Sequence, residues 1–442
     1  MRLLLSFVPA IVVFAFLAGV AYGYKQFWPI PDLRTVWQEV KAVYRGEQAS
    51  LLVPNVVKRQ PFKGEGLVAS SPNEVSAGAT VIQGLDSDGG VMRLVAEDGT
   101  LLHSWNALFF DYWPEGAVLS PQEMQPERET ALHQHGFHIH PDGSVLIIFS
   151  HLGAVLVDRC SEVIWRLDEL VHHAVTVDEA GGYWMPAHRQ LGEIDVSFLR
   201  REDAGALVER LEAGERDRIG DVILRVDRQG RVTERLDPME AFADAEIIGL
   251  IGLGYWWDPL DPLHINEVVP VTAPLADRID GVEVGDLLLS VRNMNMLAII
   301  GRDGALKWHR TGPWFGQHDP DITEQGLIEV FDNGFLKVPR FGERGSSVLE
   351  LDPTTGAVAR ATPKGDAKLF ETQWMGAHQR LPNANRLIVE SMGGRVLEVT
   401  PDNRVVWEYH LRWDEEFAGT VTAAERVSPG FFDEPPETWA CP

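Results

Sequence analysis

The feature that most constrains the fold of this chain is a unit in which a histidine opens an extended apolar segment that ends at a tight turn. Five such units occur, and their histidines are His135, His173, His264, His318 and His378. In three of the units a turn glycine follows eight residues after the histidine, at Gly143, Gly181 and Gly326. Strands and turns that recur at intervals of roughly 40–60 residues indicate radial or solenoid repetition.

Each unit has a second turn, and a sixth turn of this kind, Asp98-Gly99, belongs to an earlier stretch that lacks the histidine. A tryptophan follows soon after this turn in four of the six stretches, at Trp105, Trp165, Trp308 and Trp407. Apolar runs bounded by Gly, Asn and Asp predict strands. These runs are Ser144–Phe149, Asp221–Val226, Asp286–Val291, Leu327–Phe331 and Arg386–Glu390. Six units of about four short strands predict an all-β, six-bladed β-propeller closed around a central channel. A β-sandwich would not repeat a histidine in phase.

The units begin near residues 79, 135, 173, 264, 318 and 378, which places the propeller at residues 79–415. The third unit is much longer than the others. Residues 196–218 within it are rich in Arg and Glu, with Leu and Val at helical spacing, so a helical insertion is expected there. Residues 416–442 are expected to form a C-terminal tail.

The N-terminal segment carries an uncharged apolar run from Leu3 to Tyr24, between Arg2 and Lys25, that is long enough to span a bilayer. Residues 1–28 are therefore predicted to be a transmembrane anchor, and residues 29–78 a short helix and tether. A cleaved signal peptide is the alternative, because Gly19-Val20-Ala21 offers a small-x-small cleavage site. In both cases the propeller is exported. With the anchor retained, the protein is single-pass in the inner membrane and its propeller faces the periplasm.

Charge and motif content exclude several classes of function. A net charge of −26 argues against nucleic acid as a partner, because binding to nucleic acid needs a basic surface. The sequence has no phosphate loop, dinucleotide fingerprint or Gly-x-Ser-x-Gly elbow, and no cofactor is predicted. Cys160 and Cys441 are the only cysteines. A disulfide between them would tie the tail to the ring, and two unpaired thiols are the alternative.

The repeat histidines are expected to begin the innermost strands, so they would converge at the mouth of the channel. His264 and Asn266 lie on the same face of one strand. Arg292 follows another strand of the same blade, where its guanidinium can hold an anion with two donors. His318 opens the following blade. For each histidine taken alone, a structural hydrogen bond to a neighbouring blade remains the alternative to a functional role.

Two further histidine groups need an interpretation. In the pair His172-His173 only His173 falls in phase with the repeat, so His173 is the candidate. His135, His138 and His140 resemble a metal-binding cluster, but neither cysteines nor a carboxylate-rich pattern accompanies them. No metal site is therefore predicted.

Six short motifs, spread over about residues 79–412, surround these candidates. They are His172-His173, Leu263-His264-Ile265-Asn266, Ser290-Val291-Arg292-Asn293 with Asn295, Gln317-His318-Asp319, Phe331-Asp332-Asn333-Gly334 and Gln379-Arg380-Leu381-Pro382-Asn383. In these motifs the chain resembles the bacterial arylsulfotransferases, periplasmic aryl-sulfate sulfotransferases that use no nucleotide sulfate donor. The resemblance implies a six-bladed propeller, an aryl sulfate donor and a phenolic acceptor. It also implies ping-pong transfer through a sulfohistidine.

The resemblance implies a role for each candidate residue. His318 would be the nucleophile, while His173, His264 and Arg292 would hold the sulfuryl oxygens with support from Asn266. The chain departs from the best-known members of that family in having a predicted anchor in place of an N-terminal β-domain used for dimerisation. Its two cysteines are also far apart rather than closely spaced. The oligomeric state is therefore left open.

Two other functions compete with sulfotransfer. One is a sulfate-ester hydrolase that uses the same histidine with water as the acceptor. The other is a non-enzymatic, membrane-anchored propeller that acts as a scaffold or ligand-binding module. The set of His173, His264, Arg292 and His318 favours an enzyme, because a scaffold has no need of all four side chains.

Overall fold

The computed structural model describes residues 64–120, 125–131, 134–190, 218–245, 247, 249–250, 261–334 and 345–441. The chain divides into two compact units, Met1–Asn55 and Val56–Pro442, and all described residues lie in the second. The predicted anchor (1–28), the tether as far as residue 63, and residues 196–217 of the predicted insertion lie outside the described residues. None of the helices within the described ranges is long and apolar enough to cross a membrane.

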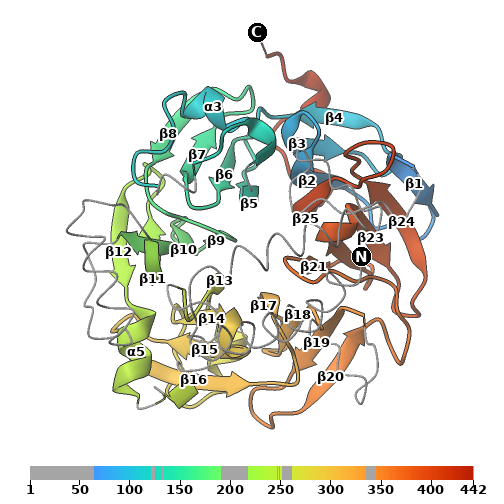
Figure 1. The fold of residues 1–442 in the computed structure, drawn as a ribbon. Helices are drawn as coiled ribbons and strands as arrows, with labels where there is room; N and C mark the ends of the chain where they lie inside the picture. The colour runs from blue at the N-terminus through green and yellow to red at the C-terminus, as the bar shows by residue number, and fades with distance from the viewer. Residues whose placement is uncertain are drawn as a thin grey trace, which may run out of the picture. The chain divides into compact units, whose positions relative to one another are not determined.

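Six antiparallel sheets surround a central channel, so the prediction of an all-β six-bladed propeller is confirmed (Figure 1). From the innermost strand outwards, blade 1 contains β25 (Thr420–Val427), β2 (Ala79–Asp86), β3 (Gly89–Val95) and β4 (Leu101–Ser104). Blade 2 contains β5 (Gln134–Ile139), β6 (Val145–Phe149), β7 (Gly153–Val157) and β8 (Val163–Leu167). Blade 3 contains β9 (Thr176–Val177), β10 (Tyr183–Gln190), β11 (Arg218–Val226) and β12 (Val232–Leu236). Blade 4 contains β13 (Ile265–Pro270), β14 (Leu287–Val291), β15 (Met296–Ile300) and β16 (Leu306–Thr311). Blade 5 contains β17 (His318–Ile322), β18 (Ile328–Asp332), β19 (Ser347–Leu351) and β20 (Val358–Thr362). Blade 6 contains β21 (Ala377–Arg380), β22 (Arg386–Glu390), β23 (Arg395–Val399), β24 (Val405–His410) and β1 (Gly66–Ser70).

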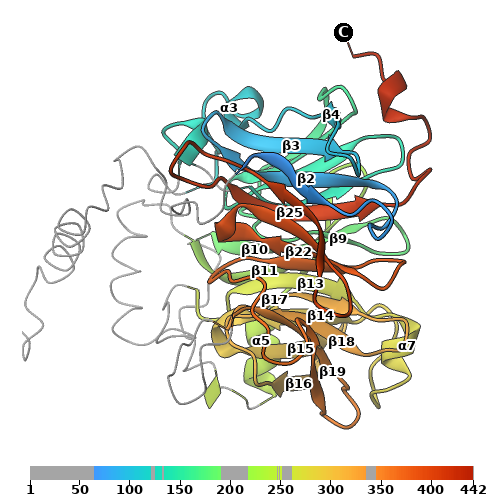
Figure 2. The same cartoon turned by 90° about the vertical axis from the view of Figure 1, so that its right-hand side faces the viewer.

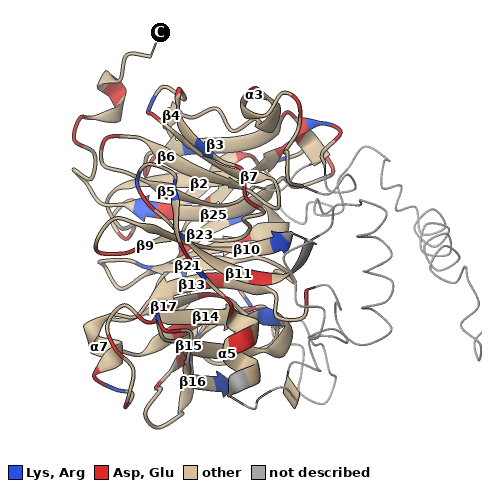
Figure 3. Ribbon diagram, turned by 90° about the vertical axis from the view of Figure 1, so that its left-hand side faces the viewer, with Lys and Arg blue, Asp and Glu red and all other residues tan. Residues whose placement is uncertain are grey.

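The described helices are short and lie between strands or at their ends. They are α3 (Phe109–Tyr112), η2 (Glu129–Ala131), α5 (Pro238–Asp244), α7 (Ala273–Ala276), η4 (Arg292–Met294), η6 (Ser391–Gly393) and η7 (Pro436–Thr438). The five strands predicted from apolar runs correspond to β6, β11, β14, β18 and β22. The side view shows the ring edge-on, with β2, β3 and β25 of blade 1 in the upper part and β15, β16 and β19 of blades 4 and 5 in the lower part (Figure 2). Acidic and basic positions are intermixed along the described strands and loops (Figure 3).

The core lies between neighbouring blades, and strand β6 shows why its sequence is apolar throughout. All five residues of β6 are buried. Val145, Ile147 and Phe149 pack in one cluster with blade 1, whereas Leu146 and Ile148 pack in another with blade 3. Successive side chains of a strand point to opposite faces, so a strand covered on both faces must be apolar at every position.

Both described ends of the chain close the ring. Strand β25 pairs with β2 along its whole length and becomes the innermost strand of blade 1. Strand β1 pairs with β24 and extends blade 6. The predictions that residues 416–442 form a tail and that residues 29–78 form a tether were therefore wrong for Thr420–Val427 and Gly66–Ser70. Neither strand carries the repeat histidine, and each pairs with a strand more than 300 residues away in sequence.

Three of the four repeat tryptophans connect adjacent blades. The indole Nε1 atoms of Trp105, Trp165 and Trp407 donate to the carbonyl oxygens of Gly143 (2.9 Å), Arg228 (3.0 Å) and Glu97 (2.9 Å), respectively. Each acceptor lies in a turn of the next blade. Trp308 packs instead against the apolar cluster shared by blades 4 and 5. The recurring tryptophan thus helps to hold one blade to the next.

The C-terminal segment after β25 is attached to blade 2. Cys160, in the β7–β8 turn, forms a disulfide with Cys441, and their Cα atoms are 5.2 Å apart. The ring of Trp439 packs 4.8 Å from that of His103 and 6.1 Å from that of Trp105. Of the two alternatives that the sequence leaves open for the cysteines, the structure therefore has the disulfide.

Candidate active site

The repeat histidines stand at the start of the innermost strands or a few residues before it. His318 is the first residue of β17, His135 and His378 are the second residues of β5 and β21, and His264 directly precedes β13. His173 lies three residues before β9. A cavity of about 270 Å³ opens among these strands and is lined by residues from all six blades. Its lining includes His135, His173, Asn266, His318, His378 and Glu425.

The backbone at these positions departs from regular strand geometry. His173 and His264 have φ angles of 58° and 49°, a left-handed conformation that is uncommon for residues other than glycine. The strand register shifts at the start of β13 and again at the start of β17, next to His318. Bulges of this kind redirect side chains and recur beside functional sites. Local backbone distortion therefore helps to turn the repeat histidines toward the channel.

Three of the predicted imidazoles come together. The ring centroid of His173 lies 4.9 Å from that of His264 and 6.2 Å from that of His318. The ring of His135 is also close, 4.1 Å from His173. His173 and His318 are almost fully buried, whereas the side chain of His264 is 26% exposed. Among His173, His264 and His318, His264 is thus the most open to solvent.

Arg292 lies beside these imidazoles. It begins η4, directly after β14, and its backbone N–H donates to the carbonyl of His264 over 3.2 Å. Its Nη1 donates to Oδ1 of Asn293 (2.8 Å). Burial lowers the pKa of the Arg292 guanidinium. Arg292 and His264 are not among the residues that line the 270 Å³ cavity, whereas His173, Asn266 and His318 are.

The hydrogen bonds of His318 determine its tautomer. Its Nδ1 lies 2.8 Å from Oδ1 of Asn333 and 3.0 Å from the carbonyl oxygen of Gly316. Both partners are acceptors, so Nδ1 carries the proton and Nε2 keeps a lone pair. Burial, followed by the charge of Arg292, lowers the pKa of His318 to about 3. His318 is therefore a neutral imidazole near pH 7.

Asn333 positions the ring of His318. Sequence reasoning included Asn333 in a motif but assigned it no role. Its Nδ2 donates to the carbonyl oxygens of Thr372 (3.0 Å) and Met375 (2.6 Å). These bonds fix the amide so that its oxygen faces His318. The sequence signal is Asp332-Asn333-Gly334, which follows the buried part of β18.

Asn266 lines the cavity, but its amide nitrogen donates to the backbone carbonyl of Gln317 over 2.7 Å. It therefore holds the segment that carries His318. Its Oδ1 is buried and accepts no hydrogen bond from the described residues. The amide nitrogen of Asn266 is thus used to hold the backbone of Gln317, and only its oxygen, which is an acceptor, is left over. Asn266 is therefore not placed to donate a hydrogen bond to an anion.

Asp261 orients His264, and sequence reasoning did not single it out. Nδ1 of His264 lies 2.5 Å from Oδ2 of Asp261, and the backbone N–H of His264 donates to Oδ1 over 3.1 Å. The carbonyl of Asp261 also accepts from Nδ2 of Asn293 (2.8 Å). Asp261 thus connects the histidine of this blade to the segment that contains Arg292.

His378 has a different environment from the other repeat histidines. Its Nδ1 lies 2.7 Å from Asp319 Oδ2, and its Nε2 lies 3.6 Å from Glu329 and 3.7 Å from Asp321. Burial opposes its charged form, but these carboxylates outweigh burial and raise its pKa to about 10. Glu329 also pairs with Arg386 of blade 6. His378 therefore acts as a cationic link between blades 5 and 6, which is the structural alternative considered for each histidine.

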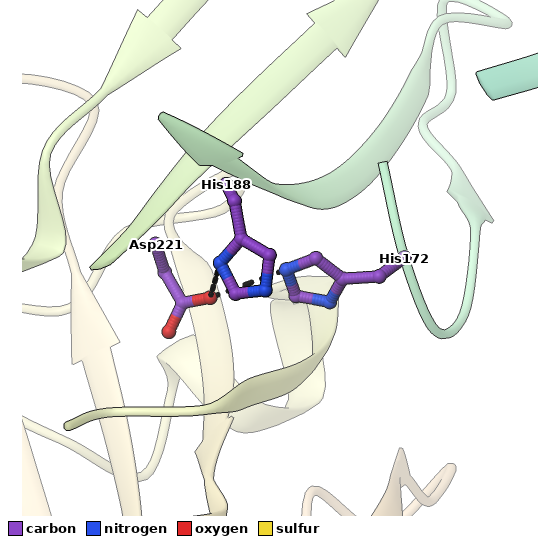
Figure 4. Close-up of side chains that lie close together, drawn as sticks. All are labelled: His172, His188 and Asp221. Carbon is purple, nitrogen blue, oxygen red and sulfur yellow. Dashed lines mark ion pairs between the residues drawn. The ribbon is translucent and has the colours of Figure 1, made fainter. Parts of the chain in front are cut away.

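A second group of imidazoles, His172 and His188, lies next to His173. The Nδ1 atoms of His172 and His173 are 2.8 Å apart, and the rings of His172 and His188 are 4.2 Å apart. His188 and Asp221 are opposite each other on β10 and β11 (Figure 4). Sequence reasoning missed both residues, because the long connection 191–217 separates the two strands in the chain and the sequence does not reveal their register.

The histidines first considered for metal binding take other roles. Nε2 of His140 lies 2.8 Å from the hydroxyl of Tyr183, and burial, followed by the charge of His140, lowers the pKa of His138 to about 4. Within the described ranges, two groups have ligand atoms close enough to hold one ion. They are His172, His188 and Asp221, and Asp319, Asp321 and His378.

The fold and site together define a six-bladed propeller whose channel carries a neutral histidine beside other imidazoles and a guanidinium. The family model described as Arylsulfotransferase (ASST) matches residues 138–412, and the chain belongs to this family. Membership suggests that the protein is a sulfotransferase enzyme. It also implies an aryl sulfate as donor and a phenol as acceptor. Independence from a nucleotide donor is general in the family.

Comparison with other proteins adds little. No curated protein matches the chain. A solved structure of a protein of unknown function from Bacteroides caccae is similar, with 11% identity, a TM-score of 0.46, and coverage of 76% of this chain and 94% of that one. TolB from Acinetobacter baumannii has 12% identity, a TM-score of 0.41, and coverage of 78% and 66%. Virginiamycin B lyase from Staphylococcus aureus has 11% identity, a TM-score of 0.33, and coverage of 63% and 70%. Similarity at this level carries no argument about activity.

Proposed function

We propose that this protein transfers a sulfuryl group from an aryl sulfate to a phenolic acceptor by a ping-pong mechanism, with His318 as the nucleophile. The observation that carries the proposal is the state of His318: it lines the cavity as a neutral imidazole whose proton is on Nδ1. A neutral imidazole with a free lone pair on Nε2 is the form that can attack sulfur.

In the first half-reaction, the Nε2 lone pair of His318 forms an N–S bond as the bond between sulfur and the aryl oxygen breaks. The phenolate leaves with that electron pair and takes up a proton. Positive charge develops on the imidazole ring, and Asn333 Oδ1 and the Gly316 carbonyl stabilise it through the Nδ1 proton. In the second half-reaction, the acceptor phenol loses its proton, its oxygen attacks sulfur, and the lone pair returns to Nε2.

His173, His264 and Arg292 would hold the three sulfuryl oxygens during both steps. Arg292 supplies a fixed positive charge close enough to His318 to lower the pKa of that histidine. Donors that are fixed before the reaction and aimed at developing negative charge commonly account for the largest part of rate enhancement. Asn266 would act through the backbone of Gln317, keeping His318 in line with the sulfur.

The location belongs to the same proposal. The apolar run Leu3–Tyr24 would anchor the protein as a single pass in the inner membrane, with the propeller in the periplasm. The Cys160–Cys441 disulfide fits an oxidising compartment. An aryl sulfate and a phenol are small molecules that can reach a periplasmic site without a nucleotide carrier.

The test is to incubate the purified full-length protein with an aryl sulfate, with and without a phenol, and to measure the mass of the intact protein. We expect a mass increase of one sulfuryl group without the phenol, and loss of this adduct when the phenol is added. His318→Asn should form no adduct and release no phenol from the donor. His309→Asn, the same change on the exposed face of edge strand β16, should behave like the unaltered protein.

The other functions predict different results. Steady release of phenol that needs no acceptor and is unaffected by added phenol would replace the proposal with a sulfate-ester hydrolase. No release and no adduct from the unaltered protein would leave a binding or scaffold role. Normal phenol release by His318→Asn would exclude the covalent mechanism.

A further inference from the structure

The group formed by His172, His188 and Asp221, next to His173, has the composition and burial of a metal site. His172 comes from the segment before β9, His188 from β10 and Asp221 from β11 (Figure 4). The three residues are 1%, 2% and 1% exposed, respectively. Two imidazoles and one carboxylate are a common donor set for zinc and related divalent ions.

The distances between the donor atoms fit one shared ion. Nε2 of His172 lies 3.2 Å, and Nδ1 of His188 lies 3.6 Å, from Oδ1 of Asp221. Zinc binds nitrogen and oxygen ligands at about 2.0–2.2 Å, so tetrahedral ligands stand about 3.3–3.6 Å from one another. These two spacings are close to the ligand spacing around one ion, and ion binding would replace the 3.2 Å contact of His188 Nδ1 with the carbonyl oxygen of Gly220.

The surroundings of Asp221 also point to a cation. Its Oδ2 accepts from the backbone N–H of Ile265 (2.9 Å), whereas its Oδ1, which faces the imidazoles, accepts no hydrogen bond in the described part of the chain. A second buried carboxylate, Asp261, lies 4.0 Å from Nε2 of His188 through its Oδ2. Burying a carboxylate is costly unless positive charge offsets it, and an ion at Asp221 would supply such charge.

We propose that His172 Nε2, His188 Nδ1 and Asp221 Oδ1 bind one divalent transition-metal ion, zinc being the ion that fits this donor set best. The other nitrogen of each imidazole then meets a partner, as is usual for metal-bound histidines. Nε2–H of His188 faces the Asp261 carboxylate, and Nδ1–H of His172 faces Nδ1 of His173. The fourth position is left for water or for His151, whose ring lies 4.8 Å from that of His188.

The proposed site has a consequence for His173. With Nε2 of His172 on the ion, Nδ1 of His172 must carry a proton and donate it to Nδ1 of His173. His173 then carries its own proton on Nε2, where it can donate to a sulfuryl oxygen. Only this last step rests on the proposed sulfotransferase function, and the metal site itself does not.

The test is metal analysis of the full-length protein, purified without chelators or a histidine tag. We expect about one zinc ion per chain. His188→Gln and Asp221→Asn should lower affinity for the ion by more than the roughly 10–100-fold that changes to outer residues cause. His309→Gln, on the exposed face of edge strand β16, should keep the ion, and so should His318→Asn.

A second measurement tests the proposal even if the variants fail to fold, because it uses the unaltered protein. Co²⁺ added to unaltered protein stripped of metal should produce a visible absorption band at one equivalent, because low-symmetry sites of nitrogen and oxygen ligands colour cobalt strongly. No bound metal after purification, together with no cobalt band in the unaltered chain, would overturn the proposal. An ion present without a sulfuryl adduct would retain the metal site and reject the proposed function, since metal content is measured without substrate.

Discussion

Two histidines at equivalent repeat positions have opposite charge states because their neighbours differ. His318 donates its Nδ1 proton to two neutral acceptors and lies near Arg292, so burial keeps it uncharged. His378 lies among Asp319, Asp321 and Glu329, so it is cationic despite similar burial. The neighbours of each imidazole, rather than its place in the repeat, decide whether it suits nucleophilic attack or an ionic contact.

Asn333 is expected to control the reactivity of His318 through its Nδ1 proton. In Asn333→Ala the proton can move to Nε2, so kcat for phenol release should fall by about 10–100-fold while KM for the aryl sulfate changes little. Asn333→Asp restores the acceptor and should recover most of the rate at neutral pH. Its carboxylate also favours the imidazolium, so activity should now decline as the pH falls below neutral. Steady-state kinetics at several pH values would measure both effects, and equal loss in the two variants would contradict this role.

His378 is expected to stabilise the propeller in a pH-dependent way. Its folded pKa of about 10 lies above the ordinary value of 6.5, so its contribution is fully present below pH 6.5 and is lost as the pH rises toward 10. His378→Gln should cost about 3–5 kcal/mol in free energy of unfolding near pH 6, and less near pH 9.5. Urea unfolding at both pH values would measure the difference, with His309→Gln as the exposed control. A cost that does not change with pH would show that His378 is not charged in the folded protein.

At the scale of the element, the innermost strands show what sequence reasoning can and cannot reach. The position of the histidines at the start of β5, β13, β17 and β21 follows from phase alone, because each blade repeats the same geometry. Contacts that cross between blades or depend on strand register do not follow. His188 meets Asp221 only because β10 and β11 pair in one particular register across a long connection. A shift of one residue would place these side chains on opposite faces.

The hydrogen bonds that tryptophans donate from one blade to the next lead to a prediction about how the blades are held together. Trp407 is fully buried and donates to Glu97 from blade 6 to blade 1, where the ring closes. Trp407→Phe keeps most of the apolar contact but leaves the Glu97 carbonyl without this donor, so it should destabilise the fold by about 1–3 kcal/mol. Trp374→Phe changes a tryptophan that is 40% exposed and should have little effect. Equal shifts in the urea midpoint for both variants would argue against the link.

At the scale of the whole molecule, the ring is closed by strands from distant parts of the chain. Strand β25 supplies the inner wall of blade 1, and its residues Thr422 to Glu425 line the cavity. Strands β2, β3 and β4 of blade 1 therefore lack their inner neighbour until Thr420–Val427 has been synthesised. The sequence does not reveal this arrangement, because β25 lacks the repeat histidine and lies within residues 416–442, for which a tail is expected.

Two truncations separate closure from attachment of the tail. A chain that ends at Val427 loses Cys441 and Trp439 but keeps β25, so it should keep the oligomeric state of the full chain and melt cooperatively at a somewhat lower temperature. A chain that ends at Gly419 also lacks Cys441, and it leaves the edge of β2 and the buried Val81 and Ile82 uncovered. It should aggregate or lose its cooperative transition. Size-exclusion chromatography and thermal melting followed by circular dichroism would distinguish the two. A chain ending at Gly419 that elutes like the full chain and melts cooperatively would contradict the role of β25.

Because β25 follows the other propeller strands in the chain, the cavity wall can form only after β25 has been synthesised. The cavity wall needs residues up to Glu425, so a chain interrupted earlier during synthesis can build most blades without assembling the site. Prematurely ended products would remain inactive and would expose a sheet edge that proteases and chaperones can recognise. Closure of the ring by β25 thus makes assembly of the cavity, and any activity that depends on it, conditional on synthesis of strands from all six blades.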